Sequence, residues 1–284
     1  MPMRLLDALR ETLDGWIEDV DPAWRPVFRE VTLGFAEVDP ALMIEPWEPI
    51  FPARRHKIFP GAPKGAHMLR AFDGLDPASV RCIILGQDPY PSADFATGRA
   101  FEAGIGRWRE LEKMFSHSVR TFMQQLCAAR TGRADLATDI DQWPRVIAAI
   151  EDGTIALETP RALMDGWVAQ GVLALNSALT LSRFAVELDP HQSRGHLPLW
   201  RPLLLRTLAF LAAQKRPIVF IAYGRIAIEA LHAAGIADLA RAPGPIALIE
   251  REHPAAGNAV LALPNPFALC NDLLRGRSAE PIRW

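Results

Sequence analysis

The stretch Val80-Arg-Cys-Ile-Ile-Leu-Gly-Gln-Asp-Pro-Tyr90 decides the fold, because a short apolar run ends there at a glycine and is followed by polar and ring side chains. Such a run, bounded by a turn residue, is typical of a strand that is buried on both faces of a parallel sheet. Similar apolar runs recur later in the chain, at residues 172–176, 217–222 and 246–250. We therefore expect four buried strands.

Helical patterns lie between these runs, at residues 118–130, 199–214 and 225–234. Buried strands that alternate with helices imply a parallel sheet with right-handed crossover connections. The sequence therefore predicts a single α/β domain, with a central four-stranded parallel sheet flanked by helices on both faces in a three-layer α/β/α arrangement.

The 284 residues are compatible with one α/β domain of ordinary size. Leucines recur at helical spacing near the start, and prolines at positions 40, 46, 49 and 52 then interrupt the pattern. We expect residues 1–50 to form an N-terminal helical extension packed on the core, and residues 51–284 to form the α/β domain. An insertion is expected around 130–161, and the basic tail at 275–284 is expected to be loose.

Composition excludes several functional classes. Lys and Arg total 31 and Asp and Glu total 33, so the net charge of −2 argues against a protein that coats nucleic acid without specificity. The three cysteines are widely spaced, which excludes a disulfide framework, a CxxC zinc site and a four-cysteine iron–sulfur cluster. The N-terminal sequence lacks the pattern of a secretory signal, and no apolar stretch is long enough to span a membrane. A cytoplasmic location without membrane association is expected.

Ligands of open parallel sheets bind beyond the carboxyl ends of the strands. Asp88, Asn176 and His253 each stand at or just after such an end. The prolines that follow Asp88 and His253 restrict the backbone of both residues. Each residue also has a plainer interpretation, as a turn carboxylate, a loop-pinning amide or a polar loop imidazole. Three such residues at one edge favour a site.

These residues, in this order, resemble the family 1 uracil-DNA glycosylases. Gly86-Gln-Asp-Pro-Tyr90 is similar to the water-activating motif of that family, and Ala169-Gln-Gly-Val-Leu-Ala-Leu-Asn-Ser-Ala-Leu-Thr180 to its uracil-reading strand. His253-Pro254 resembles the start of its DNA-entering loop. The resemblance extends from about residue 50 to 275.

The resemblance implies an enzyme that flips uracil out of single- or double-stranded DNA and hydrolyses its N-glycosidic bond, leaving free uracil and an abasic site. Asp88 would stabilise the sugar cation and orient the attacking water, and His253 would donate a hydrogen bond to uracil O2. Asn176 would bond N3–H and O4 of the base. The resemblance implies no metal and no organic cofactor, and we expect a monomer.

Three further residues are placed in the uracil pocket by the same resemblance. Tyr90 would stand against C5 and exclude the methyl group of thymine. Phe101 would stack on the flipped ring, although core packing is its plainer interpretation. Gln87 is also expected among the substrate-binding residues.

The chain departs from the family pattern at two places. Pro91 stands where the family has a histidine, so a partner of the attacking water is missing. The family continues His-Pro with Ser-Pro-Leu, whose leucine fills the vacated base stack. This chain has Ala255-Ala-Gly-Asn258 instead, and a glycine cannot fill that gap. Inhibition by the phage protein that mimics DNA and grips that leucine is therefore not expected.

DNA contacts must then come from elsewhere on the surface. The insertion at 130–161 and Arg241 are candidates, although for each arginine a solvated surface charge is the favoured plainer interpretation. The residues that we expect at the DNA are Arg194, His196, Arg251, Ala255 and Gly257.

The sequence is compatible with two other functional hypotheses. The departures from the family pattern are compatible with a damage-binding protein that holds uracil or abasic DNA and turns over slowly. A nucleotide-binding α/β enzyme of unrelated chemistry is the weaker reading, because neither GxGxxG nor GxxxxGK[ST] follows any expected strand.

Overall fold

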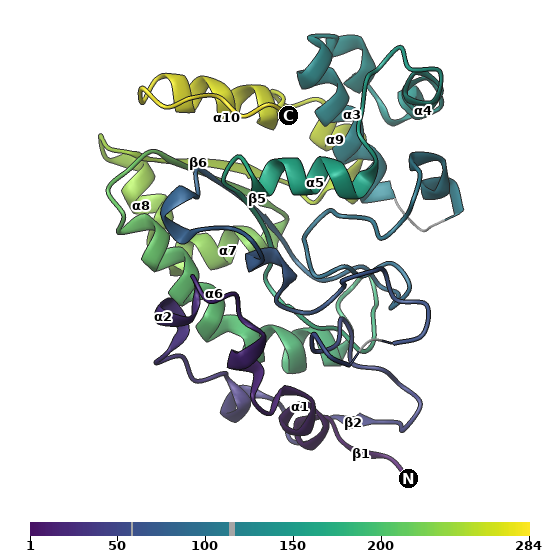
Figure 1. Cartoon of the computed structure of the whole chain (residues 1–284), viewed down its shortest axis with the longest axis vertical. Coiled ribbons are helices and arrows are strands. Elements are labelled where there is room, and N and C mark those ends of the chain that lie inside the picture. The colour runs from purple at the N-terminus through teal and green to yellow at the C-terminus, as the bar shows by residue number, and fades with distance from the viewer. Residues whose placement is uncertain (58, 114–116) are drawn as a thin grey trace.

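The computed structural model describes residues 1–57, 59–113 and 117–284 (Figure 1). Its main sheet has four parallel strands in the order β4-β3-β5-β6. The strand bounds are β3 Cys82–Gly86, β4 Val172–Asn176, β5 Ile218–Tyr223 and β6 Ile246–Arg251. The expected parallel sheet is confirmed, and its strands begin and end within a residue or two of the predicted positions.

Each strand contributes side chains to two cores, because successive residues of a strand point to opposite faces. In β3, Ile83 and Leu85 belong to one buried cluster, whereas Cys82 and Ile84 belong to the other. This double burial explains why the strands are almost wholly apolar and why the sheet needs helices on both faces.

Two groups of helices cover the sheet, and Figure 1 shows them on opposite sides of the strands. The first group packs with Ile83 and Leu85, and consists of α1 Leu5–Leu13, α2 Arg25–Phe28, α6 Leu197–Ala212, α7 Arg225–Ala233 and α8 Ile236–Arg241. The second group consists of α3 His117–Thr131, α4 Trp143–Glu151, α5 Pro160–Val168 and α10 Pro266–Arg275. The three-layer arrangement is therefore confirmed. None of the helices in the described ranges has the length and apolarity needed to cross a bilayer.

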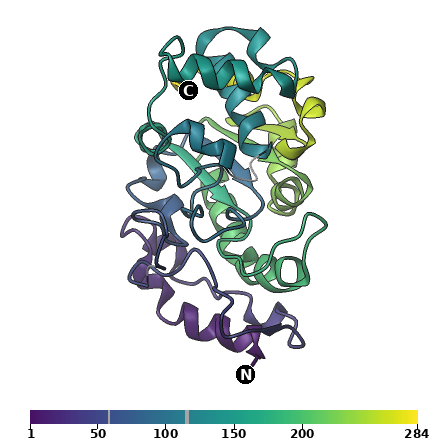
Figure 2. The same cartoon turned by 90° about the vertical axis from the view of Figure 1, so that its right-hand side faces the viewer.

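The N-terminal segment shares the core of the first helix group. Leu5, Leu9 and Leu13 of α1 are buried in the same cluster as the strands. Figure 2 shows this segment, in purple, at the end of the molecule opposite the C-terminus. Within this segment, β1 Met3–Arg4 and β2 Met43–Ile44 form a small antiparallel pair. The division of the chain at residue 50 stays a prediction.

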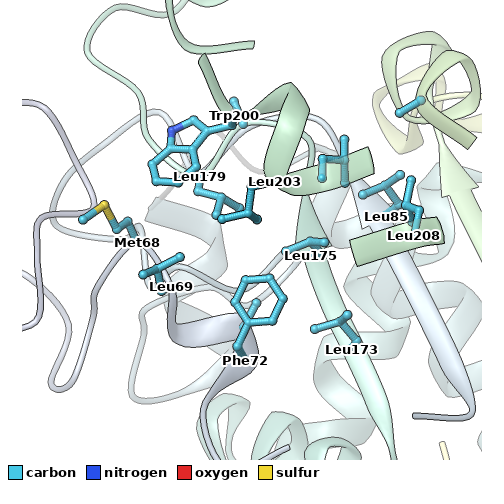
Figure 3. Close-up of a cluster of buried hydrophobic side chains, with 14 of the residues drawn as sticks. Met68, Leu69, Phe72, Leu85, Leu173, Leu175, Leu179, Trp200, Leu203 and Leu208 are labelled. Carbon is cyan, nitrogen blue, oxygen red and sulfur yellow. The ribbon is translucent and has the colours of Figure 1, made fainter. Parts of the chain in front are cut away.

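A cluster of large apolar side chains joins the sheet to the loops around it. Figure 3 shows Leu173 and Leu175 of β4 together with Phe72, Trp200 of α6 and Met68. Trp24 belongs to the same cluster: it is completely buried, and its Nε1–H donates to the carbonyl of Leu75 at 2.6 Å.

The expectation of a loose C-terminal tail is wrong. Ile282 and Trp284 are buried in the second core, and Trp284 Nε1 donates to the carbonyl of Phe267 at 2.9 Å. The indole ring also packs edge-on against Trp167, at a centroid distance of 5.3 Å. The basic residues before it suggested a solvated tail, but two apolar anchors at its end outweigh them.

Replacing Trp24 tests how far the N-terminal segment contributes to stability. Trp24→Ala should lower the free energy of unfolding by about 3–5 kcal/mol, because it empties a large buried volume. Trp47→Ala is the matched control, since Trp47 is 76% exposed and should change stability by less than about 0.5 kcal/mol. Denaturant unfolding of both variants measures the difference. Similar values for both would show that the N-terminal segment unfolds independently of the core.

Candidate active site

A cavity of about 680 Å³ lies at the carboxyl edge of the sheet. The strands end together there, because Gly86 of β3 stands opposite Asn176 of β4, and Tyr223 of β5 opposite Arg251 of β6. Seven of the predicted site residues line this cavity: Asp88, His253, Gln87, Tyr90, Phe101, Asn176 and Ala255. Arg194, His196, Arg251 and Gly257 are not among its lining residues.

The lack of a side chain at Gly86 allows Asn176 and Phe101 to approach the end of β3 closely. A Cβ atom at position 86 would lie 2.7 Å from Oδ1 of Asn176 and 3.4 Å from Cε2 of Phe101. Any larger residue would displace that amide. The Gly86 carbonyl is held in turn by the backbone N–H and the hydroxyl of Ser177, each at 2.9 Å. The amide and the ring therefore meet directly above the end of β3.

Asp88 is held through one of its two carboxylate oxygens. Oδ2 accepts hydrogen bonds from the side-chain amides of Gln87 and Gln192, both at 2.7 Å. Oδ1 is buried and has no hydrogen-bond partner among the described residues. Burial raises the pKa of Asp88, and the two amide hydrogen bonds oppose that rise. The carboxylate is therefore fixed in orientation, and Oδ1 can accept a hydrogen bond from a ligand.

Gln192 was not identified from the sequence, although it contacts Asp88 directly. It opens a π-helical turn, Gln192–His196, and its side chain is completely buried. Its Oε1 accepts hydrogen bonds from the backbone N–H groups of Ala185 and Asp189, at 2.9 and 2.8 Å. One side chain thus joins the carboxylate to the loop at 183–189. The only signal in the sequence was a polar segment beside a helix, which does not distinguish Gln192 from its neighbours.

The imidazole of His253 is a hydrogen-bond donor toward the cavity. Its Nδ1 accepts from the backbone N–H of Ala255 at 3.2 Å, which places the proton of the neutral ring on Nε2. Burial lowers the pKa of His253, so the neutral form is favoured. Gly224, with φ of +88°, lets the chain after β5 pass close to this ring.

No hydrogen bond joins the side-chain amide of Asn176 to another described residue, although the residue as a whole is only 4% exposed. The amide atoms are not among the side-chain atoms that are both buried and unsatisfied, so they reach the surface of the cavity. The amide lines the cavity, so its carbonyl and its NH₂ group are both available to a ligand.

Phe101 presents an aromatic ring under backbone strain. Its φ of +59° lies in the left-handed region that favours glycine, and its ring is stacked on Phe122 at 4.5 Å with an interplanar angle of 3°. Ion pairs on either side of Phe101 hold this turn. Arg99 pairs with Asp165 at 2.7 Å, and buried Glu102 pairs with Arg70. Strain of this kind persists only where the surroundings determine the conformation, as they often do at functional sites.

Tyr90 and Pro91 form a further part of the cavity wall. The Tyr90 ring packs edge-on against Phe95, at a centroid distance of 6.1 Å. Pro91 also lines the cavity but carries no side-chain donor or acceptor. No three His, Cys, Asp or Glu side chains come together as metal ligands in the described parts of the chain.

His196 requires correction as a DNA-contacting residue. It is completely buried, and its ring nitrogens bond the hydroxyls of Thr180 and Ser182, each at 2.9 Å. Burial lowers the pKa of His196 to about 3, so the ring is neutral and supports the core. Arg194, two residues earlier, pairs with Asp39 at 2.5 Å in the N-terminal segment.

Two further DNA-contacting candidates make contacts within the chain. The guanidinium of Arg251 donates to the carbonyls of Glu250 and Pro264, both at 2.7 Å. Gly257 is buried, and a Cβ atom there would lie 3.5 Å from Cδ1 of Ile140, so this position faces the protein and not a DNA strand. Only Ala255 of the loop after His253 is both exposed and part of the cavity wall.

Comparisons with known proteins show what the chain as a whole is similar to. No protein-family model matches the chain. The uracil-DNA glycosylase of Mycobacterium tuberculosis H37Rv is 29% identical over 228 residues, covering 78% of this chain and 80% of that protein. The uracil-DNA glycosylase of Exiguobacterium sibiricum is 28% identical over 265 residues, covering 92% and 97%.

Solved structures give the same result at the level of the fold. The wild-type UNG of Nitratifractor salsuginis aligns with a TM-score of 0.57 and 25% identity, covering 92% of this chain and 93% of that one. A mimivirus UNG variant solved in complex with UGI has a TM-score of 0.59 and 15% identity, covering 96% and 94%. The predicted resemblance to the uracil-DNA glycosylase superfamily is confirmed by these relatives.

Removing the Asp88 charge should show that the carboxylate is not there for stability. The pKa of Asp88 is raised in the folded state, so ionisation disfavours folding above the unfolded pKa of about 3.9. Asp88→Asn should therefore leave the melting temperature unchanged or raise it at pH 7, because the new oxygen can accept the same two amide hydrogen bonds. The difference in melting temperature between Asp88→Asn and wild type should be smaller at pH 4.5 than at pH 7.

The control for this measurement is Asp94→Asn, which neutralises an exposed carboxylate on the same loop and should have little effect at either pH. A loss of more than about 1 kcal/mol in Asp88→Asn at pH 7 would show instead that the carboxylate holds the fold together.

Proposed function

We propose that this chain, a diverged member of the uracil-DNA glycosylase superfamily, removes uracil from DNA by hydrolysing the bond between the base and deoxyribose. One observation carries the proposal: a carboxylate, an amide that makes no hydrogen bond to the described residues and a neutral imidazole donor line a single cavity at the sheet edge. Relatives that span most of the chain bear the name of this activity, which supports the same conclusion. The products would be free uracil and an abasic site.

Recognition of the base is assigned to Asn176 and His253. Uracil offers a donor at N3 and an acceptor at O4, which match the carbonyl and the NH₂ group of one amide. The Nε2–H of His253 would donate to O2 on the other side of the ring. Cytosine presents the opposite pattern at N3 and C4, so its groups and the buried amide would be left unpaired, which can reject an analogue strongly.

The base must leave the duplex before it can reach this cavity. The cavity has the volume of an ordinary small-molecule pocket and accommodates a pyrimidine. Phe101 would stack on the flipped ring, a contact worth about 1–3 kcal/mol. Tyr90 would stand against C5, where a thymine carries its methyl group.

Bond cleavage separates charge, and the two catalytic groups match the two charges that develop. As the bond from C1′ to N1 breaks, the sugar becomes cationic and the base anionic. The electron pair of that bond leaves with the base. Ionised Asp88 stabilises the cation, and its Oδ1 accepts a hydrogen bond from the water that attacks C1′ and takes the proton that this water loses as the C1′–O bond forms. The neutral His253 donor stabilises the negative charge as it grows on O2. Both interactions strengthen in the transition state, so they accelerate the reaction instead of only binding the substrate.

The direct test is excision from a labelled oligonucleotide that contains one uracil. Alkali-labile abasic sites should appear in single-stranded and in duplex substrates, whereas matched oligonucleotides with cytosine or thymine should stay intact. Absence of cleavage at high protein concentration would overturn the proposal.

Several finer expectations stay predictions: a monomer, a cytoplasmic location, and lack of inhibition by the phage protein. One observation opposes the predicted lack of inhibition: a mimivirus UNG variant with this fold was solved in complex with UGI. The damage-binding alternative is not favoured by the comparisons. The effect of Pro91 on the attacking water also stays a prediction.

Asp88→Asn should lower single-turnover excision by about 10²–10⁴-fold. The neutral side chain can no longer stabilise the cation, and the NH₂ group in place of Oδ1 cannot accept a hydrogen bond from the attacking water. Binding of uracil DNA, measured by fluorescence anisotropy on the same oligonucleotide, should change by only a few fold. If binding and turnover fell together, the carboxylate would be serving to hold the binding surface.

Asn176→Asp should relax discrimination between uracil and cytosine by about 10²-fold or more, since a carboxylate cannot donate to O4 and repels it. The measurement is the ratio of kcat/KM for uracil and cytosine oligonucleotides. Asn265→Asp, which alters a helix cap outside the cavity, serves as the control. An unchanged ratio in Asn176→Asp would show that the amide does not read the base.

A further inference from the structure

The rim of the cavity carries two exposed apolar side chains. Phe184 is 42% exposed and Val186 is 73% exposed, and both line the cavity. Of the large apolar side chains that are exposed in residues 1–57, 59–113 and 117–284, only these two belong to the cavity wall. Apolar groups gathered at the mouth of a site, where water contact is unfavourable, indicate a surface that binds a partner.

The loop that carries them, residues 183–189, is held in a defined conformation. Gln192 fixes it from within by accepting hydrogen bonds from the N–H groups of Ala185 and Asp189. Its start is anchored where Arg183 pairs with Glu48, at 2.5 and 2.7 Å, and this pairing lowers the pKa of Glu48 to about 2. A loop that is tied at both ends can press its exposed side chains against a partner with little loss of conformational entropy.

Among the described residues, the loop after His253 cannot supply an apolar group of useful size. Ala255 is the exposed member of the cavity wall after His253 and offers a single methyl group. Gly257 faces Ile140 inside the protein. Proteins that unstack bases commonly insert apolar side chains such as Phe or Ile at the disrupted step. Phe184 and Val186 have this chemistry and stand at the cavity that would receive the base.

We propose that Phe184 and Val186 form an apolar wedge that enters duplex DNA when the target base leaves the stack. The inference rests on the proposed function, because a wedge is needed only if a base is flipped into the cavity. Gln192 gives the wedge a fixed relation to the chemistry, since the same side chain bonds Asp88 and the wedge loop. The loop is therefore positioned to fill the stack while the carboxylate faces the sugar.

The test compares duplex and single-stranded uracil oligonucleotides of one sequence in single-turnover excision. The double variant Phe184→Ala/Val186→Ala should lose at least about tenfold on the duplex, where neighbouring bases and the opposite strand must be held apart. Its loss on the single strand should stay within about threefold, because no duplex has to be disrupted there. Phe184→Leu should keep most of the duplex activity, because leucine can still enter the stack.

The control is Leu239→Ala, which truncates an exposed apolar side chain outside the cavity wall and should affect neither substrate. Melting temperatures of all variants should match wild type, since the truncated groups are exposed. Equal losses on both substrates, or no loss on the duplex, would overturn the wedge while leaving the proposed function intact. A wild-type protein inactive on both substrates would overturn the proposed function and the wedge with it.

Discussion

In-register pairing of four parallel strands is the constraint from which the site follows. Because all four strands run in the same direction, their carboxyl ends and the loops after them share one edge of the sheet. Residues that are far apart in the chain, such as Asp88 and His253, therefore line one cavity. The two apolar cores stabilise this pairing from both faces, so the strand ends form a rigid frame for the loops.

The cavity concentrates features that oppose folding. The carboxylate oxygen of Asp88 that lacks a partner among the described residues and the positive φ of Phe101 each carry a free-energy cost. The core is large enough to hold them in place, and the buried Arg70–Glu102 pair together with the Arg99–Asp165 pair fixes the turn at Phe101. Polar groups that are held unsatisfied at one edge are prepared to bind a ligand that supplies the missing partners.

The sequence predicted the sheet well because strands buried on both faces must be apolar along their whole length. It also located Asp88, Asn176 and His253, since strand ends are visible as the points where apolar runs stop. Contacts made by long connections left no such pattern. Gln192 reaches Asp88 from a polar stretch, His191 to Arg194, that shows no apolar periodicity, and His196 is buried although nothing in that stretch distinguishes it. The buried end of the tail was hidden because nearby basic residues dominate that segment.

The two rims of the cavity differ in a way that suits two tasks. The loop after His253 is tied down, since Asn258 accepts a hydrogen bond from the backbone of Ile140 at 2.8 Å and the next turn, α9 Asn258–Leu261, packs beside α3. A loop this confined holds a donor in a set direction but has no side chain long enough to leave the surface. The loop at 183–189 is held at Arg183, Ala185 and Asp189 but still exposes its apolar groups. Because Gln192 links this loop to Asp88, movement of the loop would shift the carboxylate. Firm anchoring of the loop therefore matters as much as the apolar groups that it carries.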